Sequence, residues 1–584
     1  MNRRRFLAGS VALPLVARAT AIAEPARFRE EATHADFTAP VSVEPMMERY
    51  RLTRDRVLHG AGPAYTPDFL LEDIHATPGR RFTEFSGDVS GRWISSLAAA
   101  SAAYGESFPT LDEVVRRTIA LQHPEGYFGK TFHFNDSDDK DMALLWGNGR
   151  LLVGLMEYYA LKQDPTVLNS AKRLGDFLLR ISPRFNSKKM ADEFSASHFA
   201  SSYICWTQQT EGLAALYAST RDIRYRDLCA AISTRIVLRP ADHVHGYLCS
   251  LRGTLDLYNA TGDGAHLQRV EAAWQEVMHS GDVLITGGVP EAWSPKKMRT
   301  EGCAECDWLR LNLALWRATG NLMYLHTAEQ VLFNEVAMNQ FCTGDFGHAR
   351  LNELGTPGMV YVRAWWCCTL HGLRVFPDIY RSVFRTANGQ IFYDLPIDGR
   401  IKSTEISAHA TSRLASDGTV HIYIDRISAG QTLTLRKPLW AHDLKVTVNS
   451  RAVSARSIAD LKAGDVIIAT YGMTLREDQA GESQNLAHRK AFYFGPWLLG
   501  TQSQANPEYF NELYPENILI QSSAETSREK SRLPYDVPIA AKTVAYIPAE
   551  FPDQPSRVQL RAVAEQTASL PMQWEMAFMV KNNS

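Results

Sequence analysis

The chain has 584 residues, of which 45% are hydrophobic and 22% are charged, and its net charge at pH 7 is −2. These values are typical of a folded globular protein with two or three domains. With no sustained basic segment beyond the N-terminus, the sequence offers no electrostatic basis for a nucleic-acid partner.

The N-terminus has the order of an export signal. Positions 3–5 are arginines, an apolar run follows over residues 8–16, and small residues precede position 24. A charged segment, a short apolar segment and a small-residue cleavage site are typical of a signal peptide, and paired arginines before Phe-Leu are typical of the twin-arginine route. We therefore expect residues 1–23 to be a twin-arginine-type signal peptide and the mature protein to be periplasmic or secreted. An uncleaved membrane anchor is the alternative; no later segment is apolar and long enough to span a bilayer, so no stable membrane association is expected.

Residues 24–48 are polar and are expected to form an N-terminal arm, whereas residues 49–385 have apolar residues at helical spacing. Several predicted helices finish in a similar phrase, in which an apolar-aromatic helix end meets a turn and a new helix begins. The phrase recurs roughly every 40 to 60 residues, as in stacked helical hairpins, and its turns lie near Asp164, Asp222, Asp263 and Asn321. We predict that the hairpins close into an (α/α)6 barrel over residues 49–385; an open solenoid is the alternative.

After residue 385 the pattern changes to short β-rich runs separated by turn residues. These runs are residues 390–393, 420–424, 433–435, 446–448, 466–468 and 491–494. We expect residues 386–584 to form one or more antiparallel β-sandwich domains, with a less readable tail after about residue 506.

Four of the eight cysteines occur in two short segments, residues 300–306 and 366–369. Two of them are adjacent, and a disulfide between neighbours needs a strained ring, whereas both sulfurs can bind one tetrahedral zinc ion. We expect the first segment to lie at the start of a helix and the adjacent cysteines to lie on a loop. One candidate ligand set joins three thiolates and a carboxylate: Glu301, Cys303, Cys367 and Cys368.

The spacing leaves two other interpretations open. Cys303 and Cys306 form a C-x-x-C pair, so an all-sulfur structural zinc site could use Cys306 in place of Glu301. Alternatively, the cysteines are ordinary core residues.

Several phrases together resemble the glycoside hydrolase family 127 / family 146 group, which includes β-L-arabinofuranosidases. The most specific are a Glu-x-Cys phrase before a helix (residues 301–303) and an adjacent cysteine pair (residues 367–368). The others are a Leu-Phe-Asn phrase (residues 332–334), an Ile-Thr-Gly-Gly strand (residues 285–288), and His243 ahead of a Thr-Gly-Asp turn (residues 261–263). The resemblance extends over roughly residues 49–500.

The resemblance implies a retaining exo-glycosidase that uses Zn²⁺ and acts on terminal furanosides, such as β-L-arabinofuranosides, of an oligo- or polysaccharide. It implies zinc ligands at Glu301, Cys303, Cys367 and Cys368, a nucleophile at Cys367 and a general acid/base at Glu291. Such a reaction proceeds by two displacements, with sulfur replacing one carboxylate of the usual pair.

Candidate substrate-binding residues come from weaker signals. His243 and the phrase containing Asp136 and Asp138 resemble sugar-site residues of the family, although Asp-Ser-Asp alone is more typical of a helix N-cap. Trp366 could stack on a sugar face. The chain departs from the family pattern at His371, after the cysteine pair, and in its additional Cys306.

Two other classes of function fit the same features. One is a non-catalytic carbohydrate-binding protein with a structural zinc site, and the other is a polysaccharide lyase on the same toroid. The sequence makes no prediction about the oligomeric state.

Overall fold

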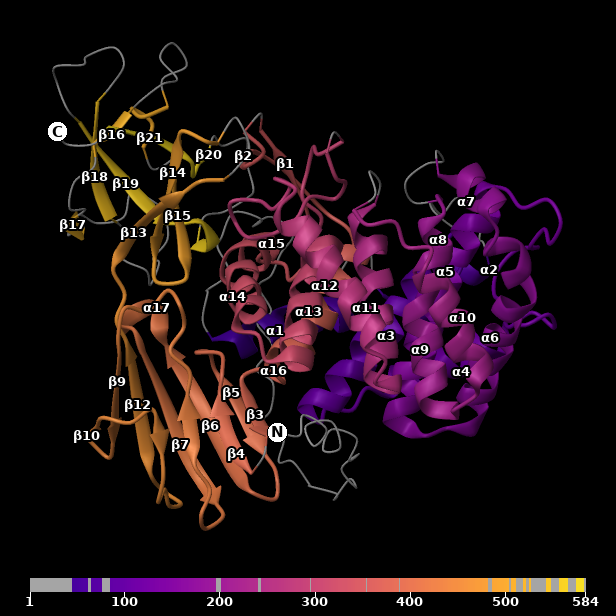
Figure 1. Ribbon diagram of the computed structural model, residues 1–584, viewed down its shortest axis with the longest axis horizontal. Coiled ribbons are helices and arrows are strands. Elements are labelled where there is room, and N and C mark those ends of the chain that lie inside the picture. Colours follow the sequence, from indigo (N-terminus) through magenta and orange to yellow (C-terminus); the bar gives the residue numbers. More distant parts are fainter. Residues whose placement is uncertain are drawn as a thin grey trace.

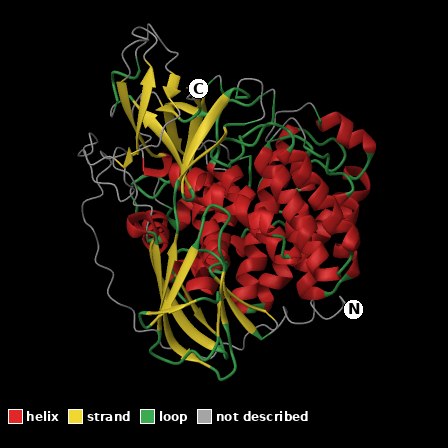
Figure 2. Cartoon of the chain, turned by 60° about the vertical axis from the view of Figure 1, so that its left-hand side comes forward, coloured by secondary structure: helices red, strands yellow, loops and turns green. Residues whose placement is uncertain are grey.

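The computed structural model describes residues 45–60, 65–75, 84–195, 201–239, 243–294, 296–352, 354–387, 389–481, 486–503, 506–510, 518–520, 525–526, 542–547, 556–565 and 574–581. The predicted signal peptide and nearly all of the predicted N-terminal arm lie outside these residues. A helical half and a β-rich half lie side by side (Figures 1 and 2). The change from helix to strand falls between Tyr380 and Phe384.

The helical half is the predicted (α/α)6 barrel. Its inner helices form a closed ring of contacts, from α3 to α5, α9, α11, α13 and α16 and back to α3. This closure confirms the barrel and excludes the open solenoid. The helices are α1 (Met46–His59), α2 (Pro67–His75), α3 (Asp88–Tyr104), α4 (Pro109–Ala120), α5 (Asp139–Lys162), α6 (Pro165–Phe185), α7 (Lys188–Phe194), α8 (Ile204–Thr207), α9 (Gln209–Thr220), α10 (Ile223–Ser233), α11 (Val244–Thr261), α12 (Gly264–Met278), α13 (Gly302–Thr319), α14 (Leu322–Gln330), the π-helix η2 (Val331–Val336), α15 (Ala337–Asn339) and α16 (Trp366–Tyr380).

The repeated turn phrase has one structure at all four places. The residue after the inner helix is left-handed, with φ of 56° at Gln163, 59° at Arg221, 76° at Gly262 and 73° at Gly320. The next residue is an Asp or Asn whose side chain accepts a hydrogen bond from the second backbone N–H of the following helix. The sequence repeat is therefore a turn that ends an inner helix and starts an outer one.

The β-rich half begins with a sandwich whose two sheets contribute to one apolar core. The six-stranded sheet has the order β10-β9-β12-β7-β6-β5, and the four-stranded sheet has the order β11-β8-β4-β3. All pairs in these sheets are antiparallel except β4 with β8. The strands are β3 (Phe384–Ala387), β4 (Gln390–Tyr393), β5 (Gly399–Lys402), β6 (Ile406–Arg413), β7 (Thr419–Ile427), β8 (Leu433–Leu435), β9 (Leu444–Val448), β10 (Arg451–Val453), β11 (Ser457–Ile458) and β12 (Val466–Tyr471), with the short helix α17 (Leu414–Asp417) between β6 and β7.

A further sheet follows the sandwich and lies at the other end of the β-rich half (Figure 1). It is antiparallel except where β16 pairs with β21. Asn334 of η2 joins it to the barrel, because its amide donates to Pro496 O at 3.1 Å and accepts from Leu498 N at 2.7 Å. The strands are β13 (Leu475–Gln479), β14 (Arg489–Phe494), β15 (Trp497–Gln502), β16 (Ile518–Ile520), β17 (Glu525–Thr526), β18 (Lys542–Ile547), β19 (Ser556–Ala562), β20 (Trp574–Glu575) and β21 (Phe578–Lys581), with the 3₁₀-helix η3 (Val563–Glu565) after β19.

A two-stranded hairpin separates α15 from α16. Its strands, β1 (Gly347–Leu351) and β2 (Pro357–Ala364), pair antiparallel from Gly347 with Ala364. Strand β1 also bridges to the segment before α13 through Arg299 and Arg350. The hairpin thus ties together the two segments that carry the cysteines. None of the described helices has an apolar stretch long enough to cross a membrane.

Candidate active site

The Glu-x-Cys phrase lies at the start of α13, where the sequence predicted a helix start. Glu301 is the N-cap residue and Cys303 lies in the first turn. Glycine between them permits close packing on α16, because a Cβ at Gly302 would lie 3.0 Å from the Cβ of Cys368. The carboxylate and the thiol therefore point from one helix end toward the second cysteine segment.

The adjacent cysteines lie in the first turn of α16 and not on a loop, so that part of the prediction is wrong. Trp365 is the extended N-cap residue, and the helix starts at Trp366. Apolar residues at helical spacing after the cysteines, such as Leu370 and Leu373, are buried and hold this first turn in the barrel. Two inner helices thus direct their N-termini, which favour negative charge, at the same group of thiols.

Glu301, Cys303, Cys367 and Cys368 form one compact donor group, with ligand atoms all within 4.8 Å of one another. The Cys368 sulfur lies 3.8 Å from that of Cys303 and 4.0 Å from that of Cys367. Two sulfurs bound to one tetrahedral zinc at about 2.3 Å lie about 3.8 Å apart, so this spacing fits one ion. Cys306 is fully buried in α13 and is not part of any metal-binding group found among the described residues.

The negative charge of the thiol group concentrates on Cys367. Hydrogen bonds from Cys303 and Cys368 hold the pKa of the Cys367 thiol well below its ordinary value, and Arg92 and His348 act in the same direction. Burial raises the pKa of both Cys303 and Cys368. Cys367 is also the partly exposed member of the group, whereas the other two sulfurs belong to fully buried residues. The partly exposed cysteine of the group therefore also carries the most acidic thiol.

The segment from Gly287 to Thr300 brings Glu291 back toward Glu301. It folds on itself through a Pro290–Thr300 bridge, and the Glu291 backbone accepts from Val244 N at 3.0 Å. Carboxylate oxygens of Glu291 and Glu301 and a ring nitrogen of His243 all lie within 4.8 Å of one another. Glu291 thus borders the donor group from the side of α11.

Glu291 is a carboxylate in this arrangement. Burial raises its pKa, but the nearby His348 ring and the ion pair with Arg299 outweigh burial and lower the pKa to about 2. The Arg299 guanidinium donates through Nη2 to Glu291 Oε1 at 2.7 Å, and His348 Nε2 lies 3.6 Å from the same oxygen. Ion pairing with Arg299 thus favours the charged form of Glu291.

The four predicted substrate-binding residues lie in different places. His243 is buried and its Nε2 lies 3.2 Å from Glu301 Oε2, and Trp366 is half-buried at the start of α16. Asp138, in contrast, caps α5 by accepting hydrogen bonds from two backbone N–H groups, and Asp136 is exposed just before it. Within the described residues, the metal-binding groups that contain a cysteine or Glu291 include neither aspartate.

Sequence reasoning missed three residues that contact this site: Arg92, Arg299 and His348. Arg92 Nη1 lies 3.5 Å from Cys303 Sγ, although α3 is more than 200 residues away in sequence. His348 comes from β1 and packs edge-on against Trp365. No local motif marks any of the three, because each acquires its role only through tertiary contact.

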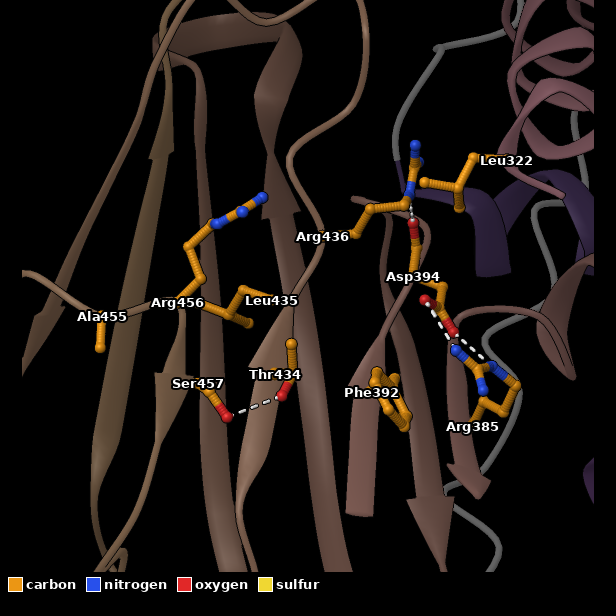
Figure 3. A pocket seen from close by; sticks show the side chains of 10 residues that line it. All are labelled: Leu322, Arg385, Phe392, Asp394, Thr434, Leu435, Arg436, Ala455, Arg456 and Ser457. Atoms are coloured by element: carbon orange, nitrogen blue, oxygen red, sulfur yellow. Dashed lines mark hydrogen bonds and ion pairs between the residues drawn. The ribbon is translucent and has the colours of Figure 1, made fainter. Parts of the chain in front are cut away.

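A separate cavity of about 500 Å³ lies between α14 and the four-stranded sheet (Figure 3). Two of its arginines are already paired with acids: Arg385 Nε lies 2.9 Å from Asp394 Oδ2, and Arg436 pairs with Glu329. None of the predicted catalytic or metal residues lines it. This cavity is therefore not the candidate active site.

Comparisons with known proteins agree with the geometry. The family model for the "Beta-L-arabinofuranosidase, GH127 catalytic domain" matches residues 74–380, more than half of the chain. A solved GH127 β-arabinofuranosidase superposes with a TM-score of 0.69 at 16% identity, over 93% of this chain and 98% of its own. A GH127 β-L-arabinofuranosidase from Geobacillus stearothermophilus T6 gives 0.68 at 14% identity, over 93% of this chain and 100% of its own.

At such identities the superpositions show a shared fold. No curated protein matches the chain by sequence. The family model decides the assignment, because its match includes every residue of the donor group and Glu291. The chain therefore belongs to glycoside hydrolase family 127 and is a glycoside hydrolase with a carbohydrate substrate.

Proposed function

We propose that this enzyme is a retaining exo-glycosidase that removes terminal furanosides, with β-L-arabinofuranosides of plant glycans as the leading substrate class. Cys367 is the proposed nucleophile and Glu291 the proposed general acid/base. The observation that carries the proposal is the donor group, in which the most acidic thiol is also the accessible one and a buried carboxylate borders the group. The similar solved structures are those of β-arabinofuranosidases, which supports arabinofuranose as the sugar.

The same four residues, Glu301, Cys303, Cys367 and Cys368, are the proposed zinc ligands. Their donor atoms and the sulfur separations of 3.8 and 4.0 Å suit a tetrahedral site. A bound zinc ion would keep the sulfurs deprotonated at neutral pH and offset part of their charge. His243 would fix the orientation of the Glu301 carboxylate through its contact at 3.2 Å.

In the first step, Cys367 Sγ forms a bond to the anomeric carbon while the glycosidic C–O bond breaks. Protonated Glu291 gives its proton to the leaving oxygen. In the second step, the Glu291 carboxylate takes a proton from water, whose oxygen attacks the anomeric carbon and breaks the C–S bond. Two displacements at one carbon retain its configuration.

Arg299 has a defined place in this cycle. Its ion pair holds Glu291 in the carboxylate form that the second step needs. The first step draws on the protonated fraction of Glu291, so Arg299 sets the upper pH limit of the first step.

The activity is tested with p-nitrophenyl β-L-arabinofuranoside and natural arabinosides, with the first product followed by NMR. We expect L-arabinose released with retained configuration, loss of turnover in Cys367→Ser and Glu291→Gln, and full activity in Cys306→Ser. An inverted product would contradict the cysteine nucleophile. Tight sugar binding unaffected by Glu291→Gln and without turnover would indicate a binding protein, and products with a new ultraviolet-absorbing double bond would indicate a lyase.

Metal content tests the ligand set separately. We expect about one zinc ion per chain, lost in Glu301→Gln and retained in the matched variant Cys306→Ser, since Cys306 lies outside the donor group. Loss of zinc in Cys306→Ser with retention in Glu301→Gln would favour an all-sulfur structural site.

We also propose twin-arginine export, on the arginines at positions 3–5 and the apolar run after them. Substitution of these arginines by lysine should retain the protein, uncleaved, in the cytoplasm. Continued appearance of the variant in the periplasmic or secreted fraction would contradict this route.

A further inference from the structure

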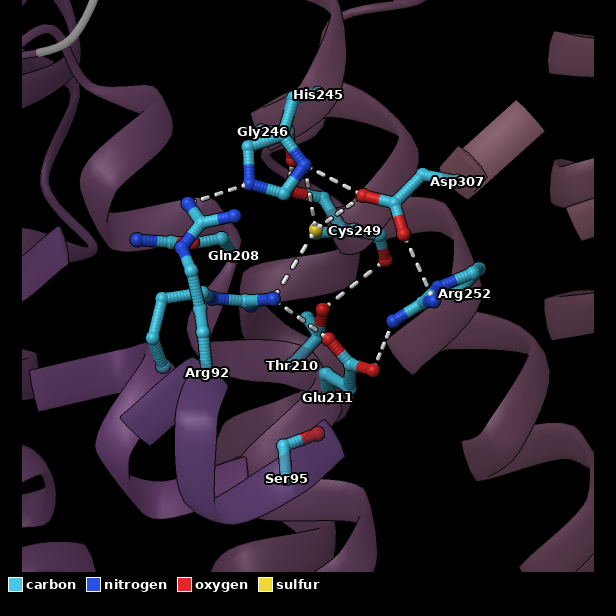
Figure 4. A network of polar contacts seen from close by, with 12 residues as sticks. Arg92, Ser95, Gln208, Thr210, Glu211, His245, Gly246, Cys249, Arg252 and Asp307 are labelled. Atoms are coloured by element: carbon cyan, nitrogen blue, oxygen red, sulfur yellow. Dashed lines mark hydrogen bonds and ion pairs between the residues drawn. The ribbon is translucent and has the colours of Figure 1, made fainter. Parts of the chain in front are cut away.

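A second polar cluster lies inside the barrel, next to the thiol group. His245, Cys249, Asp307 and His371 are all buried, and their potential ligand atoms lie within 4.8 Å of one another. Figure 4 shows His245 and Cys249 directed at Asp307, with Arg92 on the far side of the His245 ring. By composition alone, this cluster resembles another metal site.

The arginines around this cluster disfavour binding of a metal cation. Asp307 Oδ1 accepts hydrogen bonds from Arg252 Nη1 at 2.9 Å and from Arg310 Nη1 at 3.3 Å. Cys249 Sγ lies 3.2 Å from Arg150 Nη1 and donates to Asp307 Oδ2 at 3.1 Å. The carboxylate is thus already neutralised by buried guanidinium groups, and a metal ion would lie among like charges.

Instead, two histidines of the cluster each accept a hydrogen bond from the Arg92 guanidinium. Arg92 Nη2 lies 2.8 Å from His245 Nε2, and Arg92 Nη1 lies 2.9 Å from His371 Nδ1. Since a guanidinium group only donates, both of these ring nitrogens are acceptors and carry no proton. The protons therefore lie on His245 Nδ1 and His371 Nε2, which meet the two oxygens of Asp307 at 2.5 and 3.2 Å.

Asp307 thus accepts hydrogen bonds from both histidines, and each histidine accepts one from a terminal nitrogen of the Arg92 guanidinium. The third nitrogen of this guanidinium, Nε, donates to Asp88 Oδ1 at 2.7 Å. Burial lowers the pKa of His371 to about 4, so the His371 imidazole is neutral at physiological pH and its Nδ1 remains a hydrogen-bond acceptor. Arg92 is held on three sides, and its remaining contact is with Cys303 Sγ at 3.5 Å.

Given the zinc site proposed above, on which this inference rests, we propose that Arg92 is a positioning residue of the metal centre. It donates an N–H···S hydrogen bond to Cys303 and places a buried positive charge beside the thiolates. Three thiolates and one carboxylate exceed the charge of a divalent cation by two negative charges, and a buried excess of that kind needs a partner. The His245–Asp307–His371 cluster holds Arg92 in place and binds no metal itself.

The test uses the full-length holoenzyme and the variants Arg92→Met and His371→Phe. Arg374→Met is the matched control, because Arg374 is also buried in ion pairs, with Glu157 and Asp378, on the helix that carries Cys367 and Cys368. Zinc affinity is measured by competition with a chelator. The thiolate-to-metal charge-transfer band is measured after replacement of zinc by Co²⁺, because this band reports on sulfur electron density whatever happens to activity.

We expect Arg92→Met to weaken zinc binding by about 10- to 100-fold, the usual effect of losing a partner of a metal ligand. The charge-transfer band should shift to lower energy, because the sulfur loses a hydrogen-bond donor. His371→Phe should act in the same direction with a smaller effect, and it provides the test if Arg92→Met does not fold. The control should match the wild type in both measurements.

An unchanged affinity and band in folded Arg92→Met and His371→Phe would overturn the role of Arg92 while leaving the zinc site intact. Two metal ions per wild-type chain, one of them lost in His371→Phe, would overturn it in favour of a second metal site. A wild-type protein that binds no zinc at all would refute the proposed metal centre, and the role of Arg92 with it.

Discussion

Close packing of α3 against α5 gives a sharp prediction about Gly91. This glycine lies in α3, immediately before Arg92, and faces α5 without a side chain. A Cβ at this position would lie 2.5 Å from backbone atoms of Arg150 and Leu151. Gly154 of α5 repeats the contact from the other side, because its Cβ would lie 2.5 Å from Gly91 O. Backbone atoms cannot turn away as a side chain can.

Gly91→Ala therefore has to push α3 and α5 apart. Restoring ordinary contact at 3.4 Å requires a displacement of roughly 0.9 Å. Overpacking of this kind costs about 1–3 kcal/mol or more, whereas replacing Gly by Ala within a helix contributes about 0.5–1 kcal/mol in the opposite direction. We expect a net loss of about 1 kcal/mol or more in the free energy of unfolding. We also expect weaker binding of the proposed zinc ion, because Arg92 moves with α3.

Urea unfolding followed by circular dichroism measures the change, with Gly264→Ala as the control. Gly264 also lies in a helix, but a Cβ there meets nothing within 4 Å. This variant should be as stable as the wild type or slightly more stable. Unfolding of Gly91→Ala at the same urea concentration as Gly264→Ala would show that α3 and α5 tolerate the added methyl group.

Other changes give equally direct expectations. His348 and Arg299 together lower the pKa of Glu291 to about 2, so Arg299→Gln should raise this pKa and move the alkaline limit of kcat/KM to higher pH; an unmoved profile would count against Glu291 as the acid. Asn334→Ala should cost about 2–4 kcal/mol, because it leaves Pro496 O and Leu498 N buried without their partner; an unchanged unfolding midpoint would show that the joint is not needed. If the proposed zinc ion is bound, removing it with a chelator should lower both the unfolding midpoint and the activity, and added zinc should restore both.

Much of the fold could be predicted from the sequence because its signals are local. The turn phrase combines a left-handed residue with an Asp or Asn cap, and these choices depend only on neighbouring residues. The run at residues 390–393 matches β4 for the same reason. Strand order is not local: the parallel pairing of β16 with β21 joins residues some 60 positions apart, and no nearby residue indicates it.

The candidate site divides in the same way. The Glu-x-Cys phrase and the adjacent cysteines are recognisable because each is a short motif, and the structure brings them together from two helix ends. Asp138 is different, because its local sequence indicates a helix cap and the structure places it at the N-cap of α5, away from the thiol group. Arg92 could not have been predicted, because its partner His371 is 279 positions away.

The short distances between the sulfurs bear on whether metal insertion precedes export of the protein. The sulfurs of Cys303 and Cys368 lie 3.8 Å apart, close enough to be oxidised to a disulfide when no metal holds them. Such a cross-link between Cys303 and Cys368 would fasten α13 to α16 and remove ligands from the site. The proposed zinc ion would then have a second role, because it would protect the thiols of the site from oxidation. Metal insertion would have to come before the folded chain meets an oxidising compartment, and the proposed twin-arginine route would allow this because it exports proteins already folded.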